Sequence, residues 1–130
     1  QTQTPFATVL SCADSRVPAE ILFDQGIGDL FDIRVAGNIV TPAVLGSLEY
    51  AAVMLGCPLI MVMGHERCGA VTAAVQGGDF PGQIGRFVEA IAPAIAKSKS
   101  TPDDPVEASV VANVRYQVEQ VSARSPLLAQ

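Results

Sequence analysis

The sequence predicts an α/β fold in which a parallel β-sheet is flanked by helices. Apolar runs rich in strand-forming residues occupy residues 6–11, 29–37 and 58–65, and segments of helical character lie between and after them. This alternation favours parallel strands joined by right-handed helical crossovers. Because 130 residues correspond to one domain, we expect residues 1–130 to form a single unit.

The three expected strands differ in pattern. "FATVLS" is a short apolar run, and "DLFDIRVAG" alternates through Phe31, Ile33 and Val35, as a strand with one buried face does. "PLIMVMGH" is continuously apolar, which predicts a strand that is covered on both faces.

Helices are expected between and after these strands. Pro18 and Pro42 suit the first position of a helix, and Gly26 and Gly56 suit the position after its end. The segment after Pro42 is apolar almost all round, so we expect it to be buried. Pro93 should kink or divide its helix. The expected helical segments are residues 18–25, 42–56, 67–75, 83–97 and 106–124, and residues 97–105 form a linker.

A sheet of three strands is smaller than most stable sheets. We therefore expect that further chain or a partner covers its edge. The chain begins with Gln1 rather than Met, so we also expect it to be a trimmed or processed product, and a minimal natural version of the protein remains open as the alternative.

The composition restricts the partners and the compartment. Apolar residues make up 49% of the chain and charged residues 16%, which favours a homo-oligomer with little exposed surface. The net charge of −5 argues against nucleic acid or an anionic membrane as partner. No apolar run reaches the roughly 20 residues of a membrane span, and no signal peptide is visible. Three cysteines do not make a disulfide framework. We therefore expect a reducing compartment, either the cytoplasm or a microcompartment.

Two strand ends carry metal-ligand side chains. Cys12 ends the first expected strand and His65 the third, and these ends meet if the two strands are neighbours. Cys68 follows His65 by one helical turn and can face the same point. Two thiolates and one imidazole form a catalytic zinc pattern that leaves the fourth position open. The alternative, inert core thiols, remains open for this set, and Cys57, without polar neighbours, is expected to be structural.

Asp14 and Arg16 stand beside Cys12 in "SCADSR". Asp14 could close the fourth coordination position or accept a hydrogen bond from a metal-bound water, with Arg16 holding it in a bidentate pair. The alternative is an exposed ion pair contributing under about 1 kcal/mol.

The motifs "CADSR" and "GHERC" resemble the signature of the β-class carbonic anhydrases. "CADSRVPAEILFDQGIGDLFDIRVAGN", "GSLEYA" and "GHERCGAV" occur in the family's order and spacing, and the similarity is dense from residue 3 to residue 75. The resemblance implies a lyase in which zinc-bound hydroxide hydrates CO2 to bicarbonate and a proton. It implies one zinc ion held by Cys12, His65 and Cys68, with Asp14 and Arg16 as the catalytic dyad.

The resemblance also implies a substrate pocket. Gln3 would hydrogen-bond the substrate and the backbone of Gly69 would help to hold the anion. Phe31 and Tyr50 would line an apolar CO2 pocket at a dimer interface, so that they could serve the neighbouring subunit, and Val35 could add to the same apolar wall. The family's terminal helices and strands have no counterpart in this sequence.

Three other functions remain open. The same site could hydrolyse CS2 or COS, or the chain could bind zinc and bicarbonate without turnover. A reactive-cysteine enzyme using Cys12 and His65 would leave Cys68 without a role. The resting position of Asp14, on the metal or away from it, is also open.

Overall fold

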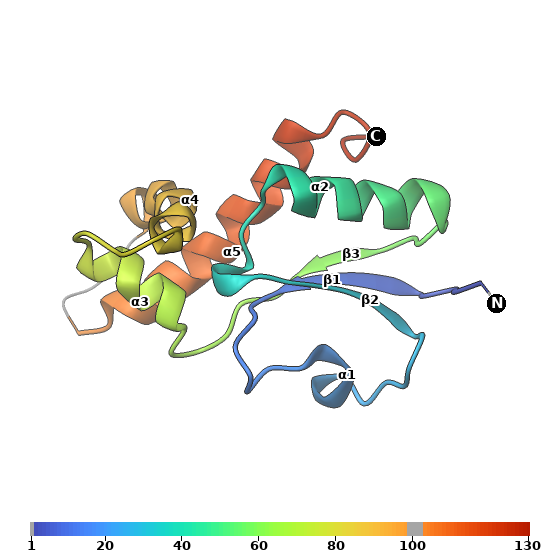
Figure 1. Cartoon of the computed structure of the whole chain (residues 1–130), viewed down its shortest axis with the longest axis horizontal. Coiled ribbons are helices and arrows are strands. Elements are labelled where there is room, and N and C mark those ends of the chain that lie inside the picture. The colour runs from blue at the N-terminus through green and yellow to red at the C-terminus, as the bar shows by residue number, and fades with distance from the viewer. Residues whose placement is uncertain (1, 99–102) are drawn as a thin grey trace.

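The computed structural model describes residues 2–98 and 103–130. These residues form a three-stranded parallel sheet with helices on both sides (Figure 1). The order is β2-β1-β3, and the strands are β1 (Ala7–Ser11), β2 (Leu30–Arg34) and β3 (Ile60–Val62). In the centre of the sheet Leu10 lies beside Ile33 on β2 and Val62 on β3. The first and third strands are therefore neighbours, as the predicted site requires.

Within residues 2–98 and 103–130, five α-helices connect and cover these strands, and most lie close to their predicted positions. The first is shorter than expected, because it starts after Pro18 and ends before Asp24, whose φ of 51° breaks the helical geometry. The second continues as a π-helix, Tyr50–Met54. The helices are α1 (Ala19–Leu22), α2 (Pro42–Glu49), α3 (Gly69–Gln76), α4 (Ile84–Lys97) and α5 (Pro105–Arg124), and a 3-10 turn spans Ala36–Asn38.

The core lies on the side of the sheet that α2 and α5 cover, opposite α1 (Figure 1). Leu10 and Ile33 point from the strands into this layer, where Leu48 of α2 and Val121 of α5 meet them. A second apolar cluster joins the sheet's carboxyl end to α3, α4 and α5, with Ile91 fully buried in it. This second cluster includes two of the cysteines of the predicted metal set.

Two predictions about burial were wrong. The third strand is not covered on both faces, because Leu59 is 50% exposed and Met61 37% exposed. The face beyond α1 is poorly covered because α1 has only four residues. The segment after Pro42 is not buried all round either, since Val53 and Met54 face solvent. Large apolar side chains therefore remain uncovered on this single chain.

The segment around Pro93 keeps one helix. Pro93 lies inside α4, which runs without interruption through 14 residues, so the expected division does not occur. Of the predicted linker, residues 99–102 lie outside the described residues, and Pro105 already begins α5. In the part of the chain that the structure describes, no helix combines the length and hydropathy needed to cross a membrane.

Candidate metal centre

The fold brings the three predicted ligands to one point at the carboxyl end of the sheet. Cys12 follows β1 directly, His65 follows β3, and Cys68 immediately precedes α3. One ligand atom from each residue lies within 4.8 Å of the other two. This meeting depends on β1 and β3 being neighbours, because parallel neighbours end at the same edge.

The donor set fits a tetrahedral zinc ion. The sulfur atoms of Cys12 and Cys68 lie 4.0 Å apart, and two thiolates on one zinc ion are about 3.8 Å apart when each Zn–S bond is about 2.3 Å. Both cysteines are buried. Cys57, the third cysteine, is also buried but lies elsewhere, where its sulfur accepts a hydrogen bond of 3.3 Å from the Thr8 hydroxyl. Its surroundings agree with a structural role.

The imidazole of His65 is oriented as a ligand. Its Nδ1 lies 2.8 Å from the carbonyl oxygen of Glu66, an acceptor, so Nδ1 carries the proton. Nε2 therefore keeps its lone pair, and it is buried with no hydrogen-bond partner among the described residues. A buried polar atom without a partner is costly, and a metal ion between the two sulfurs would satisfy it.

The two thiols form an unequal pair. A hydrogen bond from Cys68 lowers the pKa of Cys12 to about 4, and the backbone N–H of Gly37 also contributes. The same hydrogen bond raises the pKa of Cys68, because its proton is held by the Cys12 thiolate. These shifts favour the thiolate form of Cys12, and the thiolate is the form of cysteine that binds a metal ion.

Asp14 and Arg16 form the predicted bidentate pair beside the ligands. Arg16 Nε donates to Asp14 Oδ1 over 2.9 Å and Arg16 Nη2 donates to Oδ2 over 2.7 Å. These bonds hold the pKa of the Asp14 carboxyl well below its usual range. Oδ2 of Asp14 lies 3.8 Å from Nε2 of His65. The carboxylate therefore stands next to the ligand set, with Arg16 on its outer side.

A turn after His65 supports the outer side of this pair. Arg16 Nη2 also donates to the carbonyl oxygen of Arg67 over 3.2 Å. Arg67 adopts a positive φ of 54°, and its N–H donates to the Glu107 carboxylate of α5 over 3.0 Å. Through this chain of contacts α5 helps to place the guanidinium of Arg16.

Gly37 is a site residue that the sequence analysis missed. Its N–H donates to the sulfur of Cys12 over 3.4 Å, and its φ is 74°. A Cβ at this position would lie 2.6 Å from Cδ1 of Ile91 and 3.2 Å from Cβ of Ala70. A glycine at the end of the expected strand 29–37 was the available signal, but the sequence does not show what approaches it.

Arg34, at the end of β2, was also missed. Its Nε donates to the carbonyl oxygen of Cys12 over 3.0 Å, and its Nη2 donates to the carbonyl oxygen of Asp14. The signal was a charged residue at the carboxyl end of an alternating strand. The sequence could not show that its side chain reaches across to the neighbouring strand's loop.

Three of the five predicted pocket residues lie away from the ligands of their own chain. Phe31 and Tyr50 pack together, with ring centroids 6.1 Å apart, and Gln3 lines a cavity with Tyr50. Phe31 lies beside Thr8 in the sheet, about 13 Å along β1 from Cys12 at about 3.3 Å per residue. These three residues therefore lie toward the opposite end of the sheet within this chain.

The other two predicted pocket residues lie near the metal ligands. Val35 is half-buried against the apolar cluster that includes Cys12 and Cys68. Gly69 is exposed and begins α3 directly after Cys68. Within this chain, the predicted pocket therefore has its aliphatic part, Val35, next to the metal centre. Its aromatic part, Phe31 and Tyr50, lies elsewhere.

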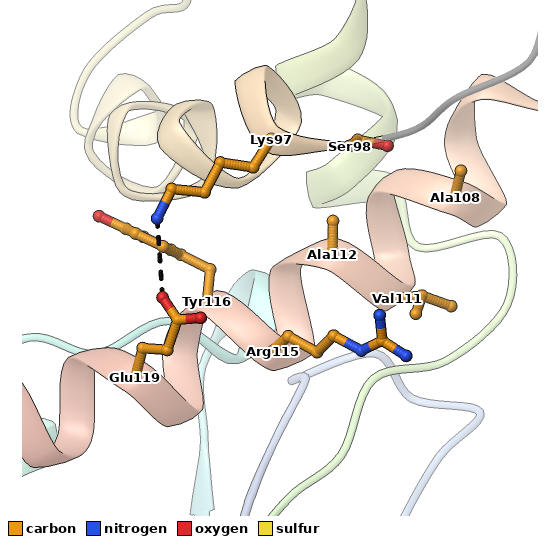
Figure 2. Close-up of a pocket in the computed structure, with 8 residues that line it drawn as sticks. All are labelled: Lys97, Ser98, Ala108, Val111, Ala112, Arg115, Tyr116 and Glu119. Atoms are coloured by element: carbon orange, nitrogen blue, oxygen red, sulfur yellow. Dashed lines mark ion pairs between the residues drawn. The ribbon is translucent and has the colours of Figure 1, made fainter.

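A separate cavity of about 410 Å³ lies between the end of α4 and α5, and Figure 2 shows the side chains that line it. Lys97 Nζ lies 3.6 Å from the carboxylate of Glu119 and 5.2 Å from the ring centre of Tyr116. None of the predicted ligand, dyad or pocket residues lines this cavity. It is therefore separate from the metal centre.

Comparisons with known proteins agree with this geometry. The carbonic anhydrase family model matches residues 7–130. The chain is 45% identical to a carbonic anhydrase of Mycolicibacterium smegmatis, over 100% of this chain and 65% of that protein. It is 43% identical to carbonic anhydrase 2 of Mycobacterium tuberculosis, over 98% of this chain and 64% of that protein.

A solved structure shows the same likeness in three dimensions. The Coccomyxa beta-carbonic anhydrase in complex with acetazolamide matches with a TM-score of 0.90 and 30% identity, over 98% of this chain and 61% of that one. The chain spans just under two thirds of the length of these relatives. With this fold, donor set and similarity, the chain belongs to the β-class carbonic anhydrase family.

Proposed function

We propose that this protein catalyses the reversible hydration of CO2 to bicarbonate and a proton at a zinc ion held by Cys12, His65 and Cys68. One observation carries the proposal: the three ligand atoms lie within 4.8 Å of one another, and the ion-paired Asp14 carboxylate is beside them. A purely structural zinc site has four protein ligands. A three-ligand site with a carboxylate fixed at its margin supports catalysis.

The dyad would orient the attacking oxygen. Zinc, when bound, lowers the pKa of a coordinated water to about 7 and so supplies hydroxide at neutral pH. Arg16 keeps the Asp14 carboxylate ionised, so its oxygens only accept hydrogen bonds. Oδ2, next to His65 Nε2, would accept a hydrogen bond from the attacking oxygen and so fix the orientation of that oxygen toward CO2.

Asp14 could instead become the fourth metal ligand in a closed state. In the described geometry Arg16 holds both carboxylate oxygens, and this arrangement favours the open state. Closure would require Asp14 to exchange a bond to Arg16 for one to the metal ion. The strength of the pair therefore opposes closure.

A second copy of the chain would complete the substrate pocket. Gln3, Phe31 and Tyr50 cluster away from this chain's own ligands. Such side chains can serve a metal centre only from a neighbouring subunit, and a two-fold dimer would supply them to both sites. The uncovered apolar side chains, Ile21 and Met54 among them, agree with burial in an oligomer. We therefore propose a homodimer or a higher homo-oligomer.

The three free cysteines are compatible with a reducing compartment, and we propose the cytoplasm. CO2 is the proposed substrate because it needs only an apolar wall beside the metal centre. Hydrolysis of CS2 or COS would use the same ligands, and no observation favours it. Zinc binding without turnover would leave the Asp14–Arg16 pair without a role.

The direct test measures zinc content and CO2 hydration for the wild type, Asp14→Ala and Asp79→Ala. Asp79 is an exposed loop carboxylate and serves as the matched control. We expect about one zinc ion per chain in all three proteins. Hydration should fall at least about 100-fold in Asp14→Ala alone. Wild-type protein that binds zinc without hydrating CO2 would reject the proposed function.

A further inference from the structure

The guanidinium of Arg34 holds two main-chain carbonyl groups of the segment that carries the metal ligand and the dyad acid. Arg34 Nε donates a hydrogen bond to the main-chain carbonyl oxygen of Cys12 over 3.0 Å, and Arg34 Nη2 donates one to the main-chain carbonyl oxygen of Asp14. Arg34 is the last residue of β2 and pairs with Ser11, the last residue of β1. From that position its side chain reaches beyond the end of the sheet to the loop after β1.

The loop after β1 needs other hydrogen-bond partners, because it lies beyond the hydrogen bonds of the sheet. The ladder between β1 and β2 ends at Ser11, whose carbonyl accepts from Val35 over 3.0 Å. The carbonyls of Cys12 and Asp14 lie beyond that ladder. The main-chain carbonyl oxygen of Asp14 also accepts a hydrogen bond of 3.2 Å from the N–H of Val17, within the loop. Among the described residues, Arg34 is what links these two carbonyls to β2.

Two arginines thus hold the same aspartate at different groups. Arg16 binds the side-chain carboxylate, whereas Arg34 binds the main-chain carbonyl. Arg16 lies on the same loop as Asp14 and can move with it. Arg34 belongs to a strand, so it relates the loop to the sheet. The two contacts have different consequences: Arg16 sets the charge and rotamer of Asp14, and Arg34 sets where the loop lies.

Resting on the proposed function, we infer that Arg34 is a positioning residue that fixes the Cys12–Asp14 segment and thereby the place of the Asp14 carboxylate beside the metal ligands. Oδ2 of Asp14 lies only 3.8 Å from His65 Nε2. A shift of about 1 Å in such a group can cost about 100-fold in rate. A fixed anchor outside the loop is what such precision requires.

The test compares Arg34→Gln and Arg34→Lys with Arg86→Gln. Arg86 is the matched control, because it donates to Gln83 at the start of α4 and takes no part in the metal centre. Hydrogen exchange of the amides of residues 13–17 is measured in metal-free and zinc-loaded protein. The absorption spectrum of the cobalt-substituted protein reports changes in the ligand field. Zinc content, kcat and KM are measured in parallel.

For Arg34→Gln we expect faster exchange at residues 13–17 but not in α5, and a changed cobalt spectrum. We expect kcat/KM to fall about 10- to 100-fold with zinc retained, as for other partners of metal ligands. Arg34→Lys should recover part of each effect, because an ammonium can donate to one or both carbonyls without the planar fork. Arg86→Gln should leave all readouts unchanged.

Unchanged exchange and an unchanged cobalt spectrum in Arg34→Gln would overturn the inference. If Arg34→Gln does not fold, Arg34→Lys decides by the same readouts, and wild-type behaviour at residues 13–17 would count against the inference. Absence of hydration in the wild type would reject the proposed function instead. The exchange and spectral readouts would still test Arg34 in that case.

Discussion

The two ends of the sheet differ in what they can do alone. The carboxyl end holds the buried sulfurs of Cys12 and Cys68 and the ion-paired carboxylate of Asp14. It also holds a ring nitrogen of His65 that has no hydrogen-bond partner among the residues that the structure describes. Toward the amino end lie Phe31 and Tyr50, and Tyr50 is 46% exposed. The first end has reactive groups without an aromatic pocket, and the second has the aromatic side chains without reactive groups. Under the proposed function, each chain would therefore carry two half-sites that face different ways.

The largest expected effect tests whether the chemistry is confined to the carboxyl end. Cys68→Ser removes one of the three proposed metal ligands, so zinc content should fall from about one ion per chain to nearly none, and hydration should be lost with it. Cys57→Ser is the matched control because Cys57 is equally buried but bonded to Thr8, outside the ligand set.

The measurement is zinc per chain after dialysis against a weak chelator. Full zinc retention in Cys68→Ser, or equal loss in Cys57→Ser, would contradict the assignment of ligands. Either result would mean that the carboxyl end is not the metal centre.

A smaller effect is expected at the backbone that supports Cys12. Gly37→Ala places a Cβ 2.6 Å from Ile91 Cδ1 at a positive φ, which should lower the free energy of unfolding by about 1–3 kcal/mol. Gly46→Ala is the control. Gly46 lies in α2 with no atom within 4 Å of an added Cβ, so this substitution should raise the free energy of unfolding by about 0.5–1 kcal/mol. Chemical denaturation measures both, and equal effects would contradict the close packing at Gly37.

Much of this architecture can be predicted from the sequence alone. The three strands were predicted from apolar runs, and the structure confirms them. Their order was the condition under which Cys12 and His65 could meet, and the structure has this order. It also brings Cys12, His65 and Cys68 together, whereas their role as zinc ligands stays a prediction. Residues such as Cys12 and His65 could be placed because strand ends are visible in a sequence. The roles of the dyad and of the pocket residues stay predictions.

Other features depend on contacts between distant segments, which the sequence does not display. Arg34 acts through a carbonyl 20 residues away in the chain, and Gly37 is required by the approach of Ile91. The exposure of Met61 reflects the shortness of α1, which a turn at Asp24 ends. Local sequence patterns therefore predict which secondary-structure element carries a residue. They do not predict which side chains from other elements it contacts.

The smallest expected effect concerns Asp32, between the two ends. Partial burial, and then the neighbouring carboxyl group of Glu20, raise the pKa of Asp32 from 3.8 to about 7. The folded chain therefore binds this proton more tightly than the unfolded chain does, and Asp32 lowers stability as the pH rises from about 4 to about 7. Because the group is largely exposed, and because the pKa of Glu20 shifts downward, the net effect should be about 1 kcal/mol or less.

Asp32→Asn removes this titration. Denaturation at pH 5 and pH 8 should show a larger gain in stability at pH 8, whereas Asp79→Asn, on an exposed loop, should show no such difference. A gain that is equal at both pH values would contradict a raised pKa at Asp32.

The claim that the two half-sites combine between subunits is tested most directly by mixing two disabled chains. Asp14→Ala disables the carboxyl end, and the double variant Gln3→Ala/Tyr50→Ala disables the amino end. After the chains are dissociated and reassociated together, the mixture should regain about a quarter of wild-type CO2 hydration, because about half of the dimers are mixed and each of these contains one intact site. A mixture whose activity does not exceed that of the separate variants would contradict the account.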